Sequence, residues 1–268
     1  MSTLSYAVTD STTMLRRQLR HMLRYPSMTL MLAGLPIVLL LLFVYVFGGT
    51  LGAGLGGFSG GFSGGRAEYV DYVTPGIMLI TVASAAQGTA ISVAMDMTEG
   101  IIARFRTMAI ARVSVLTGHV LASMIQTMLS IAVVIGVALL MGFQPTADPG
   151  DWITAIGVLA MITLALTWLS VALGMVSKSV ETASNLPMPL LLLPFLGSGF
   201  VPTDSMPAGV RWFAEYQPFT PLTETLRASL LGTPTHHHSA VLAIAWSAGL
   251  GLIGYLWAKR LFNRDPTP

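Results

Sequence analysis

The chain contains no cysteine and few charged side chains for its length. Without cysteine it can form no disulfide, no thiol nucleophile and no thiolate metal site. Charged residues make up 10% of the sequence, against about 25% in an ordinary soluble domain. A soluble protein of this size would need more charges to cover its surface, whereas a protein embedded in lipid needs no such surface. The sparse basic residues also argue against nucleic-acid binding.

Three motifs of hydrolytic enzymes are missing from the sequence. A Walker A phosphate loop needs two glycines before its lysine, and the nearest string, SKS at 177–179, has none. The glycine-rich stretch 48–65 has no lysine and is typical of a flexible loop. No H-E-x-x-H zinc motif is present, and Ser198 has no histidine on another span at matching depth. We therefore expect any ATP hydrolysis to come from another chain, and no metal site here.

Long apolar runs dominate the sequence instead. A bilayer core about 30 Å thick is crossed by a helix of about 20 apolar residues, and the alternating ten-residue segments of a β-barrel are absent. The sequence therefore predicts an all-α polytopic membrane protein with six transmembrane helices. Prolines in the fifth run predict kinks. The runs are 28–47, 72–95, 115–141, 152–176, 183–201 and 240–261.

Basic residues between these runs are strongly biased to one side. The positive-inside rule assigns that side to the cytoplasm, so both termini should be cytoplasmic, and the loops 48–65 and 202–238 should lie outside. The lead-in and the first run are too long for a cleaved signal peptide. The inner group comprises Arg16, Arg17, Arg20, Arg24, Arg104, Arg106, Arg112, Lys178, Lys259, Arg260 and Arg264, and the outer group Arg66, Arg211 and Arg227.

The N-terminal segment 1–26 contains an amphipathic pattern. Leucine and methionine at 15, 19, 22 and 23 share one helical face, and four arginines take the rest. The pattern predicts an interfacial helix on an anionic cytoplasmic leaflet. A plain positively charged flank of the first span is the alternative. The arginines of this interfacial helix are Arg16, Arg17, Arg20 and Arg24.

The segment 96–114 is too charged to span a membrane and mixes apolar with charged residues. A short helix of this kind, held between two spans, can dock on a soluble partner and pass its motion into the membrane. The alternative is a solvated loop with ordinary inside-positive charge. The candidate coupling residues are Glu99, Ile102, Arg104, Phe105, Arg106, Met108 and Arg112.

The outer segment 202–238 is rich in aromatic residues. Aromatic side chains favour membrane interfaces, so the segment predicts short helices that re-enter the outer leaflet before the last span. They either gate the path or only anchor the fold as an aromatic belt. The candidate gate residues are Trp212, Phe213, Tyr216 and Phe219. The adjacent histidines at 236–238 favour a solvated loop over a metal site.

Polar side chains within the runs are few. They line a translocation path or form hydrogen bonds between helices, and the sequence leaves both readings open. No charged residue lies in the middle of a run, which argues against a proton- or ion-coupled carrier and favours apolar or lipid-like cargo. The candidate path residues are Gln87, Gln126, Asn185, Phe195 and Phe200.

These three segments, in this order among six spans, resemble the ABC-2 type exporter permeases, and especially the daunorubicin/doxorubicin resistance branch of actinobacteria. The likeness is strongest in EGIIARFRTMAIARVSVLTGH at 99–119 and FVPTDSMPAGVRWFAEYQPFTPLTETLRASLLG at 200–232. Ala109 is a departure, because the family often has proline there. The resemblance covers nearly the whole chain, so it implies a single transmembrane domain of this type over 1–268.

The resemblance implies an export pump. Two such permeases, identical or paralogous, would pair with two cytoplasmic ATPase subunits that bind ATP and Mg²⁺, while this chain would bind no cofactor and only membrane lipids beside its partners. The cargo would be amphipathic or hydrophobic drugs, or alternatively a lipid or a polysaccharide. A secondary carrier should show internal repeats, and none is convincing here. A membrane scaffold has no evident use for a docking segment.

Overall fold

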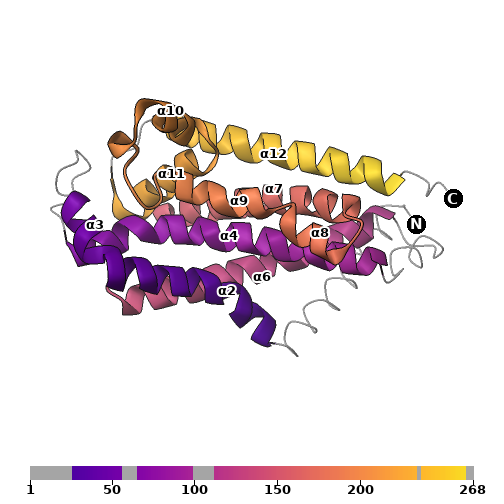
Figure 1. Cartoon of the computed structure of the whole chain (residues 1–268), viewed down its shortest axis with the longest axis horizontal. Coiled ribbons are helices and arrows are strands. Elements are labelled where there is room, and N and C mark those ends of the chain that lie inside the picture. Colours follow the sequence, from indigo (N-terminus) through magenta and orange to yellow (C-terminus); the bar gives the residue numbers. More distant parts are fainter. Residues whose placement is uncertain (1–25, 56–64, 99–111, 234–236, 264–268) are drawn as a thin grey trace.

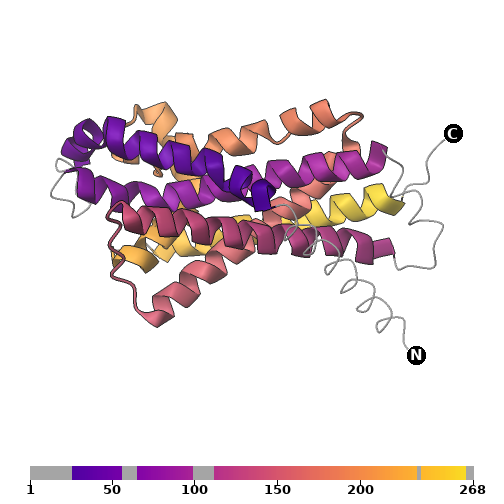
Figure 2. The ribbon, with the colours of Figure 1, turned by 90° about the horizontal axis from the view of Figure 1, so that it is seen from below.

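The computed structural model describes residues 26–55, 65–98, 112–233 and 237–263. Every regular element in these ranges is a helix, which confirms the all-α class. The long helices lie side by side along the long axis of an elongated bundle (Figure 1). Seen from below, the long helices again run roughly along this axis (Figure 2). The chain therefore passes back and forth along the length of the bundle.

Five helical stretches in the described ranges are long and apolar enough to cross a membrane. They correspond to five of the six predicted runs. The first stretch continues beyond its predicted end, so the prediction of a flexible loop was wrong for residues 48–55, which form a helix. The helices that form the five stretches are α2 (Pro26–Leu41), continued by the π-helical turn η1 (Leu42–Phe47) and α3 (Gly48–Leu55), then α4 (Arg66–Thr98), α6 (Arg112–Leu140), α7 (Pro149–Val176) and α12 (His237–Asn263).

The remaining predicted run, 183–201, does not form one long helix. It is divided into α8 (Val180–Asn185), α9 (Met188–Leu192) and the 3₁₀ turn η2 (Leu193–Leu196). Each break coincides with proline, which has no N–H to donate and clashes with the preceding helical turn. Pro187 is the N-cap of α9, and Pro194 is the second residue of η2. The expected kinks are confirmed, and they are strong enough to end the helix.

Helix α4 is the central element of the bundle. It packs against α2, α6, α7, α8 and α11, and 72% of its most apolar stretch is buried, against 28% for the first span and 22% for the last. Small residues allow the close approach. A Cβ at Gly174 of α7 would lie 2.6 Å from the carbonyl oxygen of Ala90, so only glycine fits there.

The outer faces of the peripheral helices remain apolar. Val46 is 65% exposed, Leu140 is 90% exposed and Ile153 is 72% exposed. Large apolar side chains exposed on several helices require lipid or another protein chain to cover them. The bundle is therefore built for a membrane, as its hydropathy predicts.

One end of the bundle carries short helices in addition to the long ones. The turn at 197–202 leads into η3 (Thr203–Ser205), α10 (Ala208–Tyr216) and α11 (Phe219–Leu231). These helices lie at the same end as α3 and the start of α4, on the left in Figure 1. Helix α11 is capped by Gly232, whose φ of 63° favours glycine. Helix α12 begins at His237, so the prediction of a loop was wrong for His237 and His238, which lie in its first turn.

Basic residues separate between the two ends of the bundle. Arg112 begins α6, Lys178 follows α7, and Lys259 and Arg260 lie near the end of α12, all at the end where α8 lies. The three arginines predicted to lie outside, at 66, 211 and 227, lie at the opposite end with α10 and α11. The predicted grouping of these residues is confirmed, and the side of the membrane that each end faces stays a prediction.

Candidate functional site

The two predicted cytoplasmic segments lie mostly outside the described residues. The residues that fall outside are the four arginines of the interfacial helix and all coupling residues from Glu99 to Met108. Arg112 is described as the first residue of α6. The flanks are informative, because α4 ends at Thr98 and Asp96 pairs with His119 of α6 at 2.9 Å between Oδ2 and Nε2. This contact joins the two helices where the segment leaves and rejoins the bundle.

Two of the predicted path residues lie at one contact between α4 and α8. Gln87 of α4 donates from Nε2 to the carbonyl oxygen of Ser184, at 2.7 Å. Asn185, the next residue, ends α8 and is exposed. The side chain of Gln87 therefore ties the central helix to the first fragment of the broken run.

The polar residues of α6 include a second contact between helices. Thr89 of α4 and Ser123 of α6 approach within 2.6 Å through their hydroxyl oxygens, and the hydroxyl of Thr127 donates to the carbonyl oxygen of Ser123. Gln126 is half-buried on the same helix. Gln87 and Thr89 thus form hydrogen bonds between helices, and whether Gln87 also lines a path stays a prediction.

Phe195 and Phe200 lie together toward the other end. Their rings stack with centroids 4.9 Å apart and an interplanar angle of 12°. The ring of Phe43, from the π-helical turn, lies 4.5 Å from that of Phe200. This cluster joins the first span to the end of the broken run, and it is well separated along α4 from the Gln87 contact.

The four predicted gate residues divide into two groups. Trp212, Phe213 and Tyr216 of α10 are 67%, 42% and 55% exposed. Phe219 is only 1% exposed and belongs to the core at the start of α11. The indole nitrogen of Trp246 in α12 donates to the carbonyl oxygen of Tyr216 at 3.1 Å, which fastens α10 to the last span.

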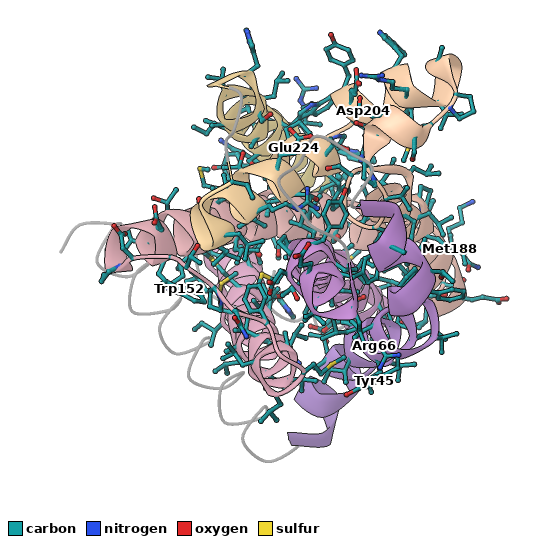
Figure 3. All side chains as sticks on the ribbon, turned by 90° about the vertical axis from the view of Figure 1, so that its left-hand side faces the viewer. Tyr45, Arg66, Trp152, Met188, Asp204 and Glu224 are labelled. Atoms are coloured by element: carbon teal, nitrogen blue, oxygen red, sulfur yellow. The ribbon has the colours of Figure 1, made fainter. Side chains whose placement is uncertain are left out.

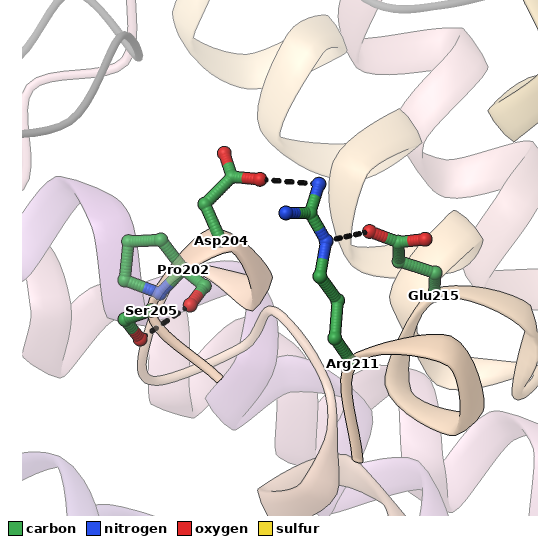
Figure 4. A network of polar contacts seen from close by, with 5 residues as sticks. All are labelled: Pro202, Asp204, Ser205, Arg211 and Glu215. Carbon is green, nitrogen blue, oxygen red and sulfur yellow. Dashed lines mark hydrogen bonds and ion pairs between the residues drawn. The ribbon is translucent and has the colours of Figure 1, made fainter. Parts of the chain in front are cut away.

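The polar side of α10 carries an exposed ion network (Figure 4). Arg211 lies between Asp204 and Glu215, with N–O distances of 2.6 Å to each. The hydrogen bond to Glu215 and the charge of Asp204 raise the pKa of Arg211 above its usual value. Figure 3, which looks along the bundle from this end, shows Asp204 and Glu224 on one side and Arg66 with Tyr45 on the opposite side.

A buried arginine lies beneath these outer helices. Arg227 of α11 is only 7% exposed. Its Nη2 atom donates to the carbonyl oxygen of Tyr72 at 3.0 Å and to that of Ser198 at 2.8 Å, and its Cζ atom lies 3.8 Å from the ring centroid of Tyr72. One side chain thus joins α11, α4 and the turn that ends the broken run.

The turn around Ser198 is fixed from several directions. The N–H of Ser198 donates to the hydroxyl of Thr220, and the hydroxyl of Tyr69 donates to the carbonyl oxygen of Phe200. A Cβ at Gly76 would lie 2.8 Å from the carbonyl oxygen of Gly199, so the backbones of α4 and the turn touch directly.

Within the described residues, no cluster of three His, Cys, Asp or Glu side chains could hold a metal ion.

Comparison with known protein families identifies the family of this chain. Residues 9–231 match the family model described as ABC-2 type transporter. The chain belongs to the ABC-2 type transporter family.

Curated relatives agree with the ABC-2 assignment. The chain is 26% identical over 258 residues to a daunorubicin resistance ABC transporter permease protein of Streptomyces coeruleorubidus, covering 96% of this chain and 87% of that protein. It is 22% identical over 180 residues to a probable doxorubicin resistance ABC transporter permease protein of Mycobacterium tuberculosis, covering 66% and 65%. The resemblance inferred from the two sequence segments is therefore confirmed, and this ABC-2 chain is a multi-pass membrane protein.

Sequence reasoning missed the contacts that Arg227 makes with distant segments of this ABC-2 chain. From the sequence, Arg227 was assigned only to the outer group of basic residues. Ser198 was considered only as a protease nucleophile, and no histidine partner was found for it. The sequence held a weak signal, because Arg227 lies between Leu226 and a run of small and apolar residues. A charge there must be buried or turned to solvent, and the sequence alone does not distinguish these outcomes.

Proposed function

We propose that this chain is the permease subunit of an ATP-driven exporter that moves amphipathic or hydrophobic compounds, drugs among them, out of the cell. The observation that carries the proposal is the family match over most of a chain with five span-length apolar helices. The named drug-resistance permeases among its relatives support the class of cargo.

In this proposal the broken run from α8 to η2 is the fifth of six spans, and α10 and α11 re-enter the outer leaflet. Both termini face the cytoplasm, where 1–26 includes an interfacial helix. The permease works as a dimer, with itself or with a paralogue. Two copies of a separate ATPase bind the ATP and Mg²⁺, and this chain binds no cofactor. The uncharged middles of the described spans are compatible with apolar cargo.

Energy enters through the segment 96–114 in this proposal. The Asp96–His119 contact supports it, because it joins the start of that segment to α6 just beyond the segment's end. A movement of the segment would then reach α4 and α6 at once. The path runs past Gln87, Gln126 and Asn185 toward Phe195 and Phe200, and the exposed aromatic face of α10 gates the outer end.

Co-purification with the candidate ATPase tests the proposal. The variant is the double substitution Arg104→Glu with Phe105→Ala. The matched control is Lys178→Glu, which reverses an exposed charge at the same end of the bundle but outside the coupling segment. We expect the wild type and the control to retain the ATPase in detergent and the double variant to lose it. A wild type that retains no ATPase contradicts the pump, and a double variant that retains it fully contradicts the coupling assignment.

The cargo is tested with the same complex in liposomes. We expect ATP-dependent movement of daunorubicin across the bilayer by the wild-type complex. Movement of a fluorescent phospholipid instead of daunorubicin would support the alternative of lipid export, to which an uncharged bundle is equally suited. Movement of neither compound would contradict both assignments.

A further inference from the structure

We propose that Arg227 is a positioning residue that latches the outer end of the permease in the arrangement seen here and releases it when the pump opens outward. The outer latch comprises Arg227, Tyr72 and the turn 198–200. The inference rests on the proposed function for its role in transport. The latch itself rests on the contacts of one buried side chain with two segments that lie 155 and 29 residues away in the sequence.

Among the described residues, no carboxylate lies within ion-pair distance of Arg227. The ion pairs of the outer end join Arg211 with Asp204 and Glu215. Glu224, three residues earlier on α11, accepts a hydrogen bond from Ser239 at 2.6 Å. The guanidinium is stabilised by two carbonyl dipoles and by the face of the Tyr72 ring. Such a buried charge stabilises one arrangement of its neighbours and becomes unfavourable when they move.

The latched arrangement also leaves polar atoms unsatisfied. The Nε atom of Arg227 and the hydroxyl of Ser198 are buried without a hydrogen-bond partner. Burying a polar group in this way is unfavourable, and water would satisfy both atoms in a more open arrangement. The unsatisfied atoms therefore reduce the free-energy difference between the latched and the open arrangement. A small difference is what a segment that opens and closes requires.

The position of Tyr72 connects the latch to the opposite end. Helix α4 runs for 33 residues without interruption from Arg66 to Thr98, which corresponds to about 50 Å. Pro75 lies one turn from Tyr72 and has no N–H for the carbonyl oxygen of Asp71, so the helix can bend beside the latch. At its other end, Asp96 holds the flank of the coupling segment. A tilt of α4 driven from that segment would pull Tyr72 away from Arg227.

Thiol labelling measures the opening of the latch directly, because the chain has no cysteine of its own. Ser198→Cys places one thiol in the turn, where the native hydroxyl has no partner and the residue is 4% exposed. The rate of its reaction with a membrane-impermeant maleimide is compared in three backgrounds: unchanged, Arg227→Met and Arg66→Met. Arg66 is the matched control, since it lies over Tyr45 at the same end of the bundle but is exposed.

We expect Arg227→Met to raise the labelling rate by about tenfold, the size of a typical coupling effect, and Arg66→Met to leave it unchanged. Arg227→Lys, which keeps the charge but cannot bond two carbonyls while stacking, should give an intermediate rate. An Arg227→Met rate equal to that of the unchanged background overturns the latch. If Arg227→Met yields no folded complex, Tyr72→Leu replaces it, because it removes the ring face and keeps both carbonyl acceptors.

Trapping the ATPase with ATP and vanadate separates a moving latch from a static brace. In the complex with Arg227 intact, we expect trapping to raise the labelling rate toward that of Arg227→Met, and to add little in the variant itself. A rate that trapping leaves unchanged overturns the proposal. If the wild-type complex moves no daunorubicin, the proposed function fails, while the Arg227→Met labelling rate still decides whether Arg227 closes the turn.

Discussion

The contact between α4 and the turn at 197–200 leads to a sharp prediction about a single methyl group. A Cβ at Gly76 would lie 2.8 Å from the carbonyl oxygen of Gly199 and 2.9 Å from its Cα. Both atoms belong to a backbone that is fixed by Thr220, Tyr69 and Arg227. The turn cannot yield cheaply, so Gly76→Ala should carry the overpacking penalty of about 1–3 kcal/mol.

Gly88→Ala is the matched control on the same helix. A Cβ there meets nothing within 4 Å, so this variant changes only the intrinsic preference of the helix for alanine over glycine. That preference is common to both substitutions and cancels when the two variants are compared. The difference between them should therefore equal the overpacking penalty.

Thermal unfolding of the purified chain in one detergent measures this difference. At about 2–4 °C per kcal/mol for a chain of this size, Gly76→Ala should melt about 2–12 °C below Gly88→Ala. The two proteins must be heated at the same rate, because membrane proteins often unfold irreversibly. Equal melting temperatures would refute the direct backbone contact and, with it, the rigid seating of the turn against α4.

Three further contacts are tested by substitution with the same assay. Asp148→Ala removes the side chain that caps α7 by accepting from the N–H of Asp151, and should lower the melting temperature by about 2–4 °C; an unchanged value contradicts the cap. Thr89→Val breaks the contact with Ser123, and a double-mutant cycle with Ser123→Ala should return about 0.6 kcal/mol; zero coupling argues against the contact. Arg211→Met removes an exposed ion network and should leave the melting temperature unchanged even at low salt; a clear loss would show that the network anchors α10.

Hydropathy and the positions of helix-breaking prolines predicted most of the architecture. Five long apolar runs became helices near the expected bounds, because a span needs only a sufficient length of apolar side chains. The prolines at 187 and 194 marked the breaks of the fifth run, although the degree of interruption was underestimated. Whether this run is one of six spans stays a prediction, as do the interfacial and re-entrant positions of the short helices.

The candidate site was predicted less completely than the fold. Gln87 was identified as a polar residue within a span, and the structure shows its partner on a neighbouring helix. Phe219 was grouped with three aromatic residues of α10, yet it lies in the core while they are exposed. Adjacent aromatic residues look alike in composition, and only the packing of α11 against the bundle separates them. The coupling residues from 99 to 108 lie outside the described part of the chain.

The sequence by itself determined the membrane class, the helical architecture and the separation of basic residues between the two ends. These properties follow from side chains near one another in the chain, because hydropathy, helix breaking and loop charge are local. Only the tertiary structure decided that Arg227 is buried against Tyr72 and Ser198. The fate of a charged side chain depends on carbonyl groups and a ring supplied by distant segments, and no local pattern specifies them.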